Sequence, residues 1–384
     1  MSRSTKLIKI LANVIYLIIL GYLVIQRSHK TVMIKKIDRF LSDIKHILMW
    51  TKIPGLEDKG QRHFIDHKCT FLNCYVTTNR SLFGDLRYFD AILFNLQDIS
   101  GDSVTLPVVR GVYQKYIFVA NDSADNYPVC NPVYDNFFNW TWSYRYDSTI
   151  TYKFITVYNA NYENLGSHFQ WIKNMTPIDL TLKTQFVTKS KAAAIFLDTC
   201  KSRSNREVFL SLLQKNLAKY NLSIDVFGDC GPLKCKRKTM FPCFWRLKKN
   251  YFFYMALEDS ISMDFVTDVI LYGYKYNAVP IVYGGAQYER FLPPNSYLNA
   301  LNFTTEDLAT HMNDIIRNRE RYYDFFRWKN HYSIKESPVL DACGLCEKMN
   351  NPRWLVHIAS YSQFRKWWNP AYEDRCMERY VIVL

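Results

Sequence analysis

The second half of the chain, from about residue 186, alternates continuous apolar runs with amphipathic stretches. The apolar runs predict four strands, at 192–197, 224–227, 251–257 and 279–283. Runs without polar interruption are typical of strands that are buried on both faces of a sheet. Because such strands alternate with helices, this half is expected to fold as a doubly wound parallel sheet, the core of an α/β protein.

Helices are expected after the first, third and fourth of these strands. Ser204 is the expected N-cap of the first helix, and the apolar face of that helix is expected to consist of Val208, Leu212, Leu213 and Leu217. The other two helices are expected at about 264–276 and 305–318.

A parallel sheet of this kind binds ligands beyond the carboxyl ends of its strands. Helix N-termini at that edge present free N–H groups and the positive end of the helix dipole, which favour phosphate. The loops at 198–206, 258–268 and 284–290 each follow the carboxyl end of a predicted strand. The sequence therefore predicts a nucleotide site at these three loops.

The N-terminal part contains one segment that can cross a membrane. Residues 10–25 carry no charge and are overwhelmingly apolar. No convincing small-residue cleavage site follows them, so they are expected to be an uncleaved signal anchor. Residues 1–9 are then a cytoplasmic tail and residues 26–62 a basic stem. The region that follows, to about residue 185, has shorter apolar strands such as 91–96 and 116–120.

The composition narrows the class of protein. The chain has 384 residues, of which 48% are hydrophobic, so two domains are expected and disorder is excluded for most of it. The net charge of +14 fits either a basic solvated surface or attraction to polyanions such as nucleotide diphosphates. No nucleic-acid-binding motif accompanies this charge, so nucleic acid is not an expected partner. Ten cysteines and six Asn-x-Ser/Thr sequons indicate an oxidising, glycosylating lumen.

Several motifs carry a family resemblance. Residues 251–297 read YFFYMALEDSISMDFVTDVILYGYKYNAVPIVYGGAQYERFLPPNSY. This segment resembles the donor-binding signature of the α1,3-fucosyltransferases, in which FYLAFENS is followed by Y-[VI]-T-E-K, VPVV-GG and Y-x-x-F-x-PP-x-S-[FY]. Residues 139–147 (NWTWSYRYD) and 325–328 (FFRW) are similar to two further family motifs, and 343–346 (CGLC) matches the C-terminal CxxC. The resemblance extends from about residue 65 to 350.

The resemblance implies a glycosyltransferase-B type fold, in which two Rossmann-like domains face a cleft, preceded by the transmembrane helix and stem. An N-terminal, acceptor-side domain is expected at 63–185 and a GDP-fucose-binding domain at 186–340. Residues 341–384 are expected to return to the N-terminal domain.

The implied activity is inverting α1,3-fucosyl transfer from GDP-fucose to a GlcNAc-type hydroxyl of a glycoprotein or glycolipid glycan. The implied location is the Golgi membrane, with a single-pass type II orientation and the catalytic domain in the lumen. No bound metal is expected, in agreement with the lack of a D-x-D motif in the sequence. Two alternatives stay open: a non-catalytic relative that kept the fold as a binding protein, and a transferase with another nucleotide-sugar donor.

The resemblance also implies the residues that act on the acceptor and the phosphates. Asp122 aligns with the Glu that is the family's catalytic base, and its side chain is one methylene shorter. Arg206 matches an Arg that contacts the GDP phosphates. Val269 stands where the family has a phosphate-binding Lys, and the basic run at 234–238 is the expected substitute for that charge.

The remaining donor-side residues lie in the 251–297 signature. Tyr254 and Asp259 match the Tyr and Asn that hold the guanosine, with Asp259 in place of the Asn. Glu258 and Thr267 keep the family's Glu and Thr, and Asp268 replaces the Glu that meets the ribose hydroxyls.

Cysteines and sequons complete the expectations. Zinc ligation by Cys343 and Cys346 with two of Cys230, Cys235 and Cys243 is an alternative to disulfides. The resemblance implies disulfides between the pair Cys69/Cys74 and the pair Cys343/Cys346, in unassigned order. Glycans are expected at the sequons that start at Asn79, Asn139, Asn174, Asn221 and Asn302. The sequon at Asn121 adjoins Asp122, and a glycan there would crowd the acceptor, so it is expected to be empty.

Overall fold

The computed structural model describes residues 43–166, 169–235, 240–337 and 342–382, and these form two compact units. Unit 1 consists of the described residues within Met1–Val119, Asp135–Thr141 and Asp341–Ser362. Unit 2 consists of those within Ala120–Tyr134, Trp142–Leu340 and Gln363–Leu384. Neither unit is continuous in the sequence. The proposed base, Asp122, therefore lies in the same unit as the predicted nucleotide loops.

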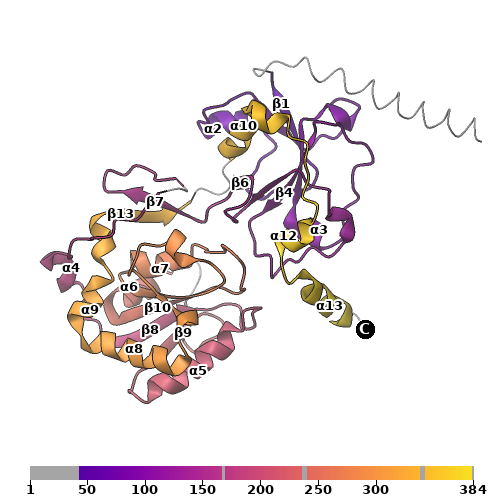
Figure 1. Cartoon of the computed structure of the whole chain (residues 1–384). Helices are drawn as coiled ribbons and strands as arrows, with labels where there is room; N and C mark the ends of the chain where they lie inside the picture. Colours follow the sequence, from indigo (N-terminus) through magenta and orange to yellow (C-terminus); the bar gives the residue numbers. More distant parts are fainter. Residues whose placement is uncertain (1–42, 167–168, 236–239, 338–341, 383–384) are drawn as a thin grey trace, which may run out of the picture. The chain divides into compact units, whose positions relative to one another are not determined.

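The first sheet has six strands in the order β2-β1-β3-β4-β5-β6. The strands are β1 (Lys45–Met49), β2 (Cys74–Thr77), β3 (Ala91–Asn95), β4 (Lys115–Ala120), β5 (Trp140–Ser143) and β6 (Ile150–Thr151). Figure 1 labels β1, β4 and β6 of this sheet. Pairing is parallel from β2 through β4, and every residue of β3 and β4 is buried. The strands expected at 91–96 and 116–120 are confirmed. The expected stem at 26–62 is too long, because strand β1 lies inside this range and contributes the fully buried residues Ile47 and Leu48 to the core.

The second sheet has five strands in the order β12-β11-β10-β8-β9, and all of its pairs are parallel. The strands are β8 (Lys191–Phe196), β9 (Ile224–Phe227), β10 (Tyr251–Leu257), β11 (Val279–Tyr283) and β12 (Leu298–Asn299). The four apolar runs of the sequence analysis are thus confirmed as neighbouring strands of one parallel sheet.

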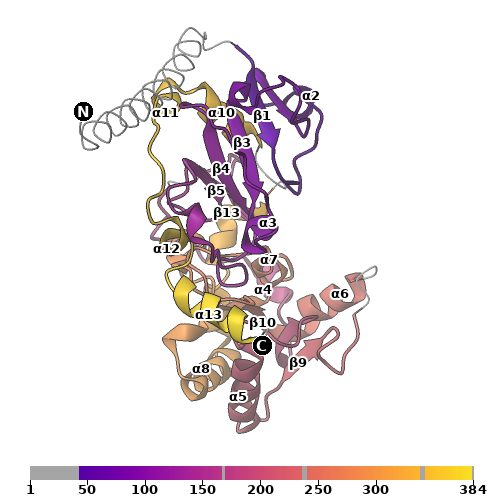
Figure 2. The same ribbon diagram turned by 90° about the vertical axis from the view of Figure 1, so that its right-hand side faces the viewer.

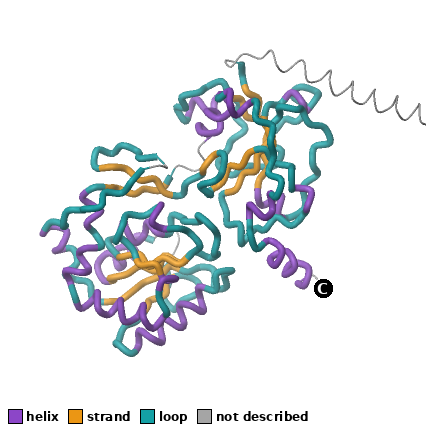
Figure 3. Tube along the Cα trace, viewed as in Figure 1, coloured by secondary structure: helices purple, strands orange, loops and turns teal. Residues whose placement is uncertain are grey.

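Helices cover both faces of this sheet, as Figure 3 shows for the unit that contains it. On one face, α5 (Arg206–Ala218) and α8 (Thr305–Arg317) lie side by side, as Figure 2 shows. Leu213 and Leu308 are fully buried there. On the other face lie α6 (Phe241–Asn250) and α7 (Ile270–Lys275). Successive side chains of β10 enter the two cores alternately, Phe253 and Met255 on one side and Tyr254 and Ala256 on the other. This is the doubly wound arrangement that the sequence predicts.

Three local predictions about the helices are wrong. Ser204 does not cap α5, since Asn205, with left-handed φ, is the N-cap. The Ser204 hydroxyl donates to Glu258 O at 2.8 Å. Val208 and Leu212 are exposed, and Leu210 takes their place in the buried stripe with Leu213 and Leu217. Of the range 264–276 that was expected to be helical, only α7 is a helix, because the residues before Ile270 form the loop that follows β10.

The other elements are short. Strands β7 (Ile155–Asn159) and β13 (Tyr332–Glu336) pair antiparallel in unit 2. The remaining helices are α2 (Arg62–Asp66), α3 (Leu96–Ser100), α4 (Leu180–Thr184), α9 (Arg319–Asp324), α10 (Ala342–Asn350), α11 (Pro352–Leu355), α12 (Phe364–Trp368) and α13 (Tyr372–Ile382). Within the described residues, none of the helices has the length and apolar character needed to span a bilayer. The predicted anchor at 10–25 lies outside the described residues.

All ten cysteines form disulfides. In unit 1, Cys69 pairs with Cys343 and Cys74 with Cys346. The disulfides between these two pairs of cysteines are thus confirmed, and their order, which was left open, is assigned. Unit 2 contains the other bridges, Cys130–Cys376, Cys200–Cys230 and Cys235–Cys243. No thiolate is left to ligate zinc.

Candidate functional site at the carboxyl ends of the second sheet

The loops that follow β8, β10 and β11 hold one another by hydrogen bonds at the carboxyl edge of the sheet. Ser204 N donates to Asp259 O at 2.9 Å, and Tyr283 Oη donates to Ser204 O at 3.1 Å. Glu258 N donates to Tyr283 O at 2.9 Å. The three segments that the sequence predicts as nucleotide loops are therefore one connected structure.

The Gly284–Gly285 pair after β11 allows this close approach. A Cβ on Gly284 would lie 2.5 Å from Tyr288 Oη and 3.1 Å from Glu258 Cγ. A Cβ on Gly285 would lie 2.8 Å from the Ser262 carbonyl oxygen. Since real Cβ atoms do not approach other atoms so closely, any side chain here would push the loops after β10 and β11 apart.

Arg206 and Tyr254 supply polar groups beneath these loops. Arg206 is the first residue of α5, and its Nη1 donates to Leu257 O at 2.7 Å, while its buried Nε has no partner among the described residues. The buried Tyr254 hydroxyl likewise has no partner there. Burial raises the pKa of Tyr254 well above its ordinary value, so this hydroxyl stays protonated and can donate. Arg206 thus places a cation at the first turn of a helix, where a diphosphate is favoured. Tyr254 lies within β10, in the core on the other face of the sheet.

Glu258 is used inside the protein. Its carboxyl group accepts from Thr267 N at 2.8 Å and from Thr267 Oγ1 at 3.0 and 3.1 Å, so it fixes the loop between β10 and α7. Burial raises the pKa of Glu258 to about 8, which keeps it protonated at neutral pH. Its position supports a bracing role, with the other side chains of the loop left to meet a ligand.

Asp122 lies two residues beyond β4, next to the loop after β10 (both in unit 2). Asn126 Nδ2 donates to Asp259 Oδ1 at 3.1 Å, which connects the two loops. Burial raises the pKa of the Asp122 carboxyl, and the charge of Asp259 adds to the rise, whereas hydrogen bonds from the Ser123 N–H and the Asn126 amide oppose it. A half-buried carboxylate with a raised pKa is suited to accept a proton from a hydroxyl group.

Two further donor-side positions lie at the start of α7. Val269 is the N-cap of α7 and packs against the apolar core. Asp268 lines a cavity of about 570 Å³ together with Tyr272, Lys275 and Glu336. Of the basic run at 234–238, only Lys234 and Cys235 are described, and Lys234 Nζ donates to Gly228 O and Gly231 O at 3.3 and 3.2 Å. Lys234 therefore braces its own turn, and the other basic residues of the run lie outside the described residues.

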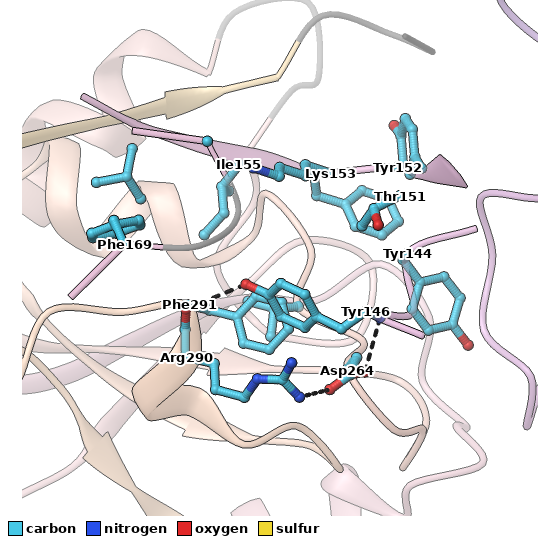
Figure 4. A pocket seen from close by; sticks show the side chains of 14 residues that line it. Tyr144, Tyr146, Thr151, Tyr152, Lys153, Ile155, Phe169, Asp264, Arg290 and Phe291 are labelled. Atoms are coloured by element: carbon cyan, nitrogen blue, oxygen red, sulfur yellow. Dashed lines mark hydrogen bonds and ion pairs between the residues drawn. The ribbon is translucent and has the colours of Figure 1, made fainter. Parts of the chain in front are cut away.

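The motif at 139–147 contributes a second connection to the loop after β10. Tyr146 N donates to Asp264 Oδ2 at 3.1 Å, and the Arg290 guanidinium lies 4.0 Å above the Tyr146 ring and 3.7 Å from Asp264 Oδ1. Figure 4 shows these side chains lining a cavity with Tyr144 and Phe291. Its volume of about 30 Å³ suits one water molecule rather than a sugar. The motif thus orders the loop rather than forming a substrate pocket.

Of the seven predicted site residues, Asp122, Arg206, Glu258, Asp259 and Thr267 lie in the connected loops of unit 2. Tyr254 is instead buried within β10, and Asp268 lines the cavity beside α7. The structure adds residues that sequence reasoning missed. Asn126, Ser262 and Asp264 connect the loop of Asp122 or the 139–147 motif to the loop after β10. Asp264 has φ of +60°, which is unusual for a non-glycine residue and follows from its place in this turn. In the described residues, no group of three or more His, Cys, Asp or Glu side chains is arranged to hold a metal ion.

The structure changes the expectation for one glycosylation site. Asn139 Oδ1 accepts from Tyr116 N at 3.0 Å, and Nδ2 donates to Ile358 O and Ala359 O at 3.2 and 3.3 Å, so both amide hydrogens are used. Asn121 has its sequon hydroxyl, Ser123 Oγ, fully buried and accepting from Asn126 N. The four remaining sequons begin at exposed residues, Asn79, Asn174, Asn221 and Asn302.

We expect Asn139 and Asn121 to be unoccupied in folded protein from secretory cells, and the four exposed sequons to carry glycans. A glycan would replace an Asn139 amide hydrogen that the fold uses. Enzymatic deglycosylation in heavy-oxygen water, followed by peptide mass spectrometry, marks each occupied Asn. Full occupancy of Asn139 in soluble, folded material would contradict the hydrogen bonds that its amide nitrogen donates.

Comparison with known proteins adds independent information. Two family models match the chain: "Glycosyltransferase family 10 (fucosyltransferase) C-term" over residues 186–367 and "Fucosyltransferase, N-terminal" over residues 42–155. Alpha-(1,3)-fucosyltransferase C of Drosophila melanogaster is 26% identical, over 86% of this chain and 79% of that protein. Glycoprotein 3-alpha-L-fucosyltransferase A of the same species is 27% identical, over 85% of this chain and 60% of that protein.

Solved structures give a weaker likeness. A crystal structure of an α1,3-fucosyltransferase with GDP-fucose matches with a TM-score of 0.46 and 13% identity, over 87% of this chain and 90% of that one. The two family models cover successive parts of the chain, with residues 156–185 between them, and include the loops described above. The chain belongs to glycosyltransferase family 10, the fucosyltransferases.

Proposed function

We propose that this protein transfers fucose from GDP-fucose, in an α1,3 linkage, to a GlcNAc-type hydroxyl of a glycoprotein or glycolipid glycan. The observation that carries the proposal is the position of Asp122. Its carboxylate lies beside the loops at the carboxyl edge of the second sheet, where Asn126 connects it to Asp259, and burial raises its pKa. The names of the related fucosyltransferases support the choice of donor sugar and linkage.

The proposed reaction is a single displacement. The Asp122 carboxylate accepts the proton of the acceptor hydroxyl, and the hydroxyl oxygen forms a bond to the anomeric carbon of fucose. The bond from that carbon to the phosphate oxygen breaks on the opposite face, and its electron pair leaves with GDP. The configuration at the anomeric carbon is therefore inverted.

The donor-side residues receive roles that fit their positions. Arg206, at the first turn of α5, balances charge on the diphosphate together with the N–H groups of that turn. Tyr254 donates from its neutral hydroxyl, and Asp259 and Asp268 accept from hydroxyl or amide groups of the nucleoside. Thr267, held by Glu258, keeps the loop in shape around the ligand.

The proposal extends to the cellular setting. A glycosyltransferase-B arrangement of the units and a Golgi location follow from the family resemblance. The signal anchor at 10–25 follows from its uncharged apolar sequence, and the lumenal side of the catalytic part from the sequons and cysteines. Five disulfides and four exposed sequons support an oxidising compartment.

A donor panel tests the function. Full-length protein, purified in detergent from secretory cells, is incubated with GDP-fucose, GDP-mannose, UDP-galactose or UDP-GlcNAc and with defined GlcNAc-containing glycans, and products are analysed by mass spectrometry and NMR. Transfer from GDP-fucose alone, with an α1,3 linkage in the product, is the expected result. Transfer from another donor, or GDP binding without any transfer, would overturn the proposal in favour of an altered donor or a non-catalytic relative.

A further inference from the structure

The loop that carries Asp122 is held by residues near the C-terminus of the chain. We call residues 121–130 the base loop and residues 364–376 the C-terminal strap; both belong to unit 2. Three strap side chains donate to main-chain carbonyls of the base loop. The bonds are Asn369 Nδ2 to Ala124 O at 2.9 Å, Trp368 Nε1 to Tyr127 O at 3.0 Å and Arg365 Nη1 to Cys130 O at 3.0 Å.

An ion pair and a disulfide reinforce these bonds. Asp125, which is only 5% exposed, accepts from Arg375 Nε at 2.5 Å and from Arg375 Nη2 at 3.2 Å. This is the bidentate geometry that gives an arginine–carboxylate pair its directional strength. The next residue of the strap, Cys376, is bonded to Cys130 at the end of the base loop. The base loop is therefore fixed at its middle and at its end.

Asp125 also connects the ion pair to the nucleotide loops. Its main-chain N–H donates to Ser262 Oγ at 3.1 Å, in the loop after β10. One residue later, Asn126 donates to Asp259 of the same loop. A displacement of Asp125 would therefore move the base loop relative to the residues proposed to hold the donor.

The 139–147 motif anchors the other part of the strap. Arg145 is 5% exposed and pairs with Asp147 through two N–H···O bonds of 2.8 and 2.9 Å. Its Nη1 donates to Trp367 O, its guanidinium lies 4.6 Å from the centre of the Trp367 ring, and Trp367 Nε1 donates to Asp147 Oδ2 at 2.9 Å. Arg145 and Asp147 thus fix the position of the strap at Trp367.

We infer that the C-terminal strap is a positioning element for the transfer reaction, in which Arg375 is a positioning residue that acts on Asp122 through Asp125. The inference rests on the proposed function of Asp122 as base. Arg375 contacts Asp125, three residues from Asp122, and the rest of the strap prevents the loop from shifting. Because a base misplaced by about 1 Å can lose on the order of 10²-fold in rate, an anchor of this kind has a measurable kinetic role.

The test compares steady-state kinetics of full-length variants with GDP-fucose as donor. Arg375→Gln should lower kcat by about tenfold or more, with the Kd for GDP unchanged within about twofold. Arg375→Lys, which keeps the charge but loses the bidentate geometry, should fall between Arg375→Gln and wild type. Asp125→Asn should reproduce the loss of Arg375→Gln, and the double variant should be no worse than either single one, since all three break the same pair.

Lys366→Gln is the matched control, because Lys366 is an exposed cation of the same strap with no ion pair among the described residues, and it should keep the wild-type kcat. If Arg375→Gln does not fold, Asp125→Asn, which breaks the same pair from the other side, replaces it with the same expectation. A kcat equal to that of Lys366→Gln, or a loss of GDP binding in parallel with kcat, overturns the positioning role while wild-type transfer still supports the function. Wild-type protein that transfers no fucose overturns both.

Discussion

Asp122→Asn is expected to lower kcat for fucosyl transfer by about 10²–10⁴-fold, the contribution of a positioned general base. The amide has the same shape but cannot accept the acceptor proton, whereas the residues around the donor are untouched, so GDP affinity should be unchanged. In wild type, kcat/KM should fall on the acid side, with an apparent pKa above the ordinary value for Asp because burial raises the pKa of Asp122. This acid limb should be lost in the residual activity of the variant. Initial rates across pH 4–9 and calorimetric titration with GDP provide both readouts.

The control for this change is Asp314→Asn, an exposed carboxylate on α8, which should leave the rates and the pH profile unaltered. Asp122→Glu asks a further question, since it adds the methylene that the aligned family residue has. A higher kcat in the Glu variant would show that the shorter side chain limits the rate. Wild-type turnover in Asp122→Asn would remove Asp122 from the mechanism.

Glu258→Gln is expected to lose less stability than wild type when the pH is raised from 5 to 8. Burial raises the pKa of Glu258 to about 8 from an ordinary 4.5, so the folded state keeps a proton that the unfolded state has released. In wild type, stability from this group is fully present below about pH 4.5, and it is lost as pH rises toward 8. This difference in pKa between the folded and unfolded states corresponds to about 3–5 kcal/mol in the free energy of unfolding. Gln does not titrate, so the variant avoids that loss. Thr267 can still donate to its amide oxygen.

Thermal unfolding of both proteins between pH 5 and pH 8 checks this expectation. Other groups titrate in this range, among them His63, whose pKa is lowered by burial. For that reason the informative quantity is the difference between the two curves. Glu347→Gln, at an exposed residue of α10, is the matched control and should run parallel to wild type. Parallel curves for Glu258→Gln would show that Glu258 titrates normally and does not brace Thr267 as a neutral acid.

The second sheet could be predicted from the sequence because its signal is local. The strands at 251–257 and 279–283 have the predicted bounds, since each is an uninterrupted apolar run. The strand at 224–227 also has its predicted bounds, although Asp225 interrupts its apolar residues. Helix starts were less predictable, because they depend on contacts with other loops. Ser204 was expected to cap α5, but it lies one residue before the N-cap, and its hydroxyl donates to Glu258 O, on a different loop.

For the site, the sequence predicted which residue types gather at the carboxyl edge but not what each one does there. Glu258 was expected among the donor-binding residues, and its burial, which decides its protonation state, depends on Gly284 and Tyr288 packing against it. The Asp125–Arg375 pair joins residues 250 positions apart. No periodicity or spacing within a short window encodes such a pair, so it can be found only once the chain is folded.

The discontinuous units have a consequence for biosynthesis. Both units include residues from the C-terminal part of the chain, so neither can be finished while that part is still on the ribosome. Cys69 and Cys74 must wait until residues 343 and 346 have been made, more than 270 positions later, and Cys130 must wait for Cys376. During that interval these thiols are open to wrong pairing. The last of these disulfides can therefore form only after Cys376 has been made. A chain truncated before residue 376 would leave Cys130, in the base loop, without its disulfide partner.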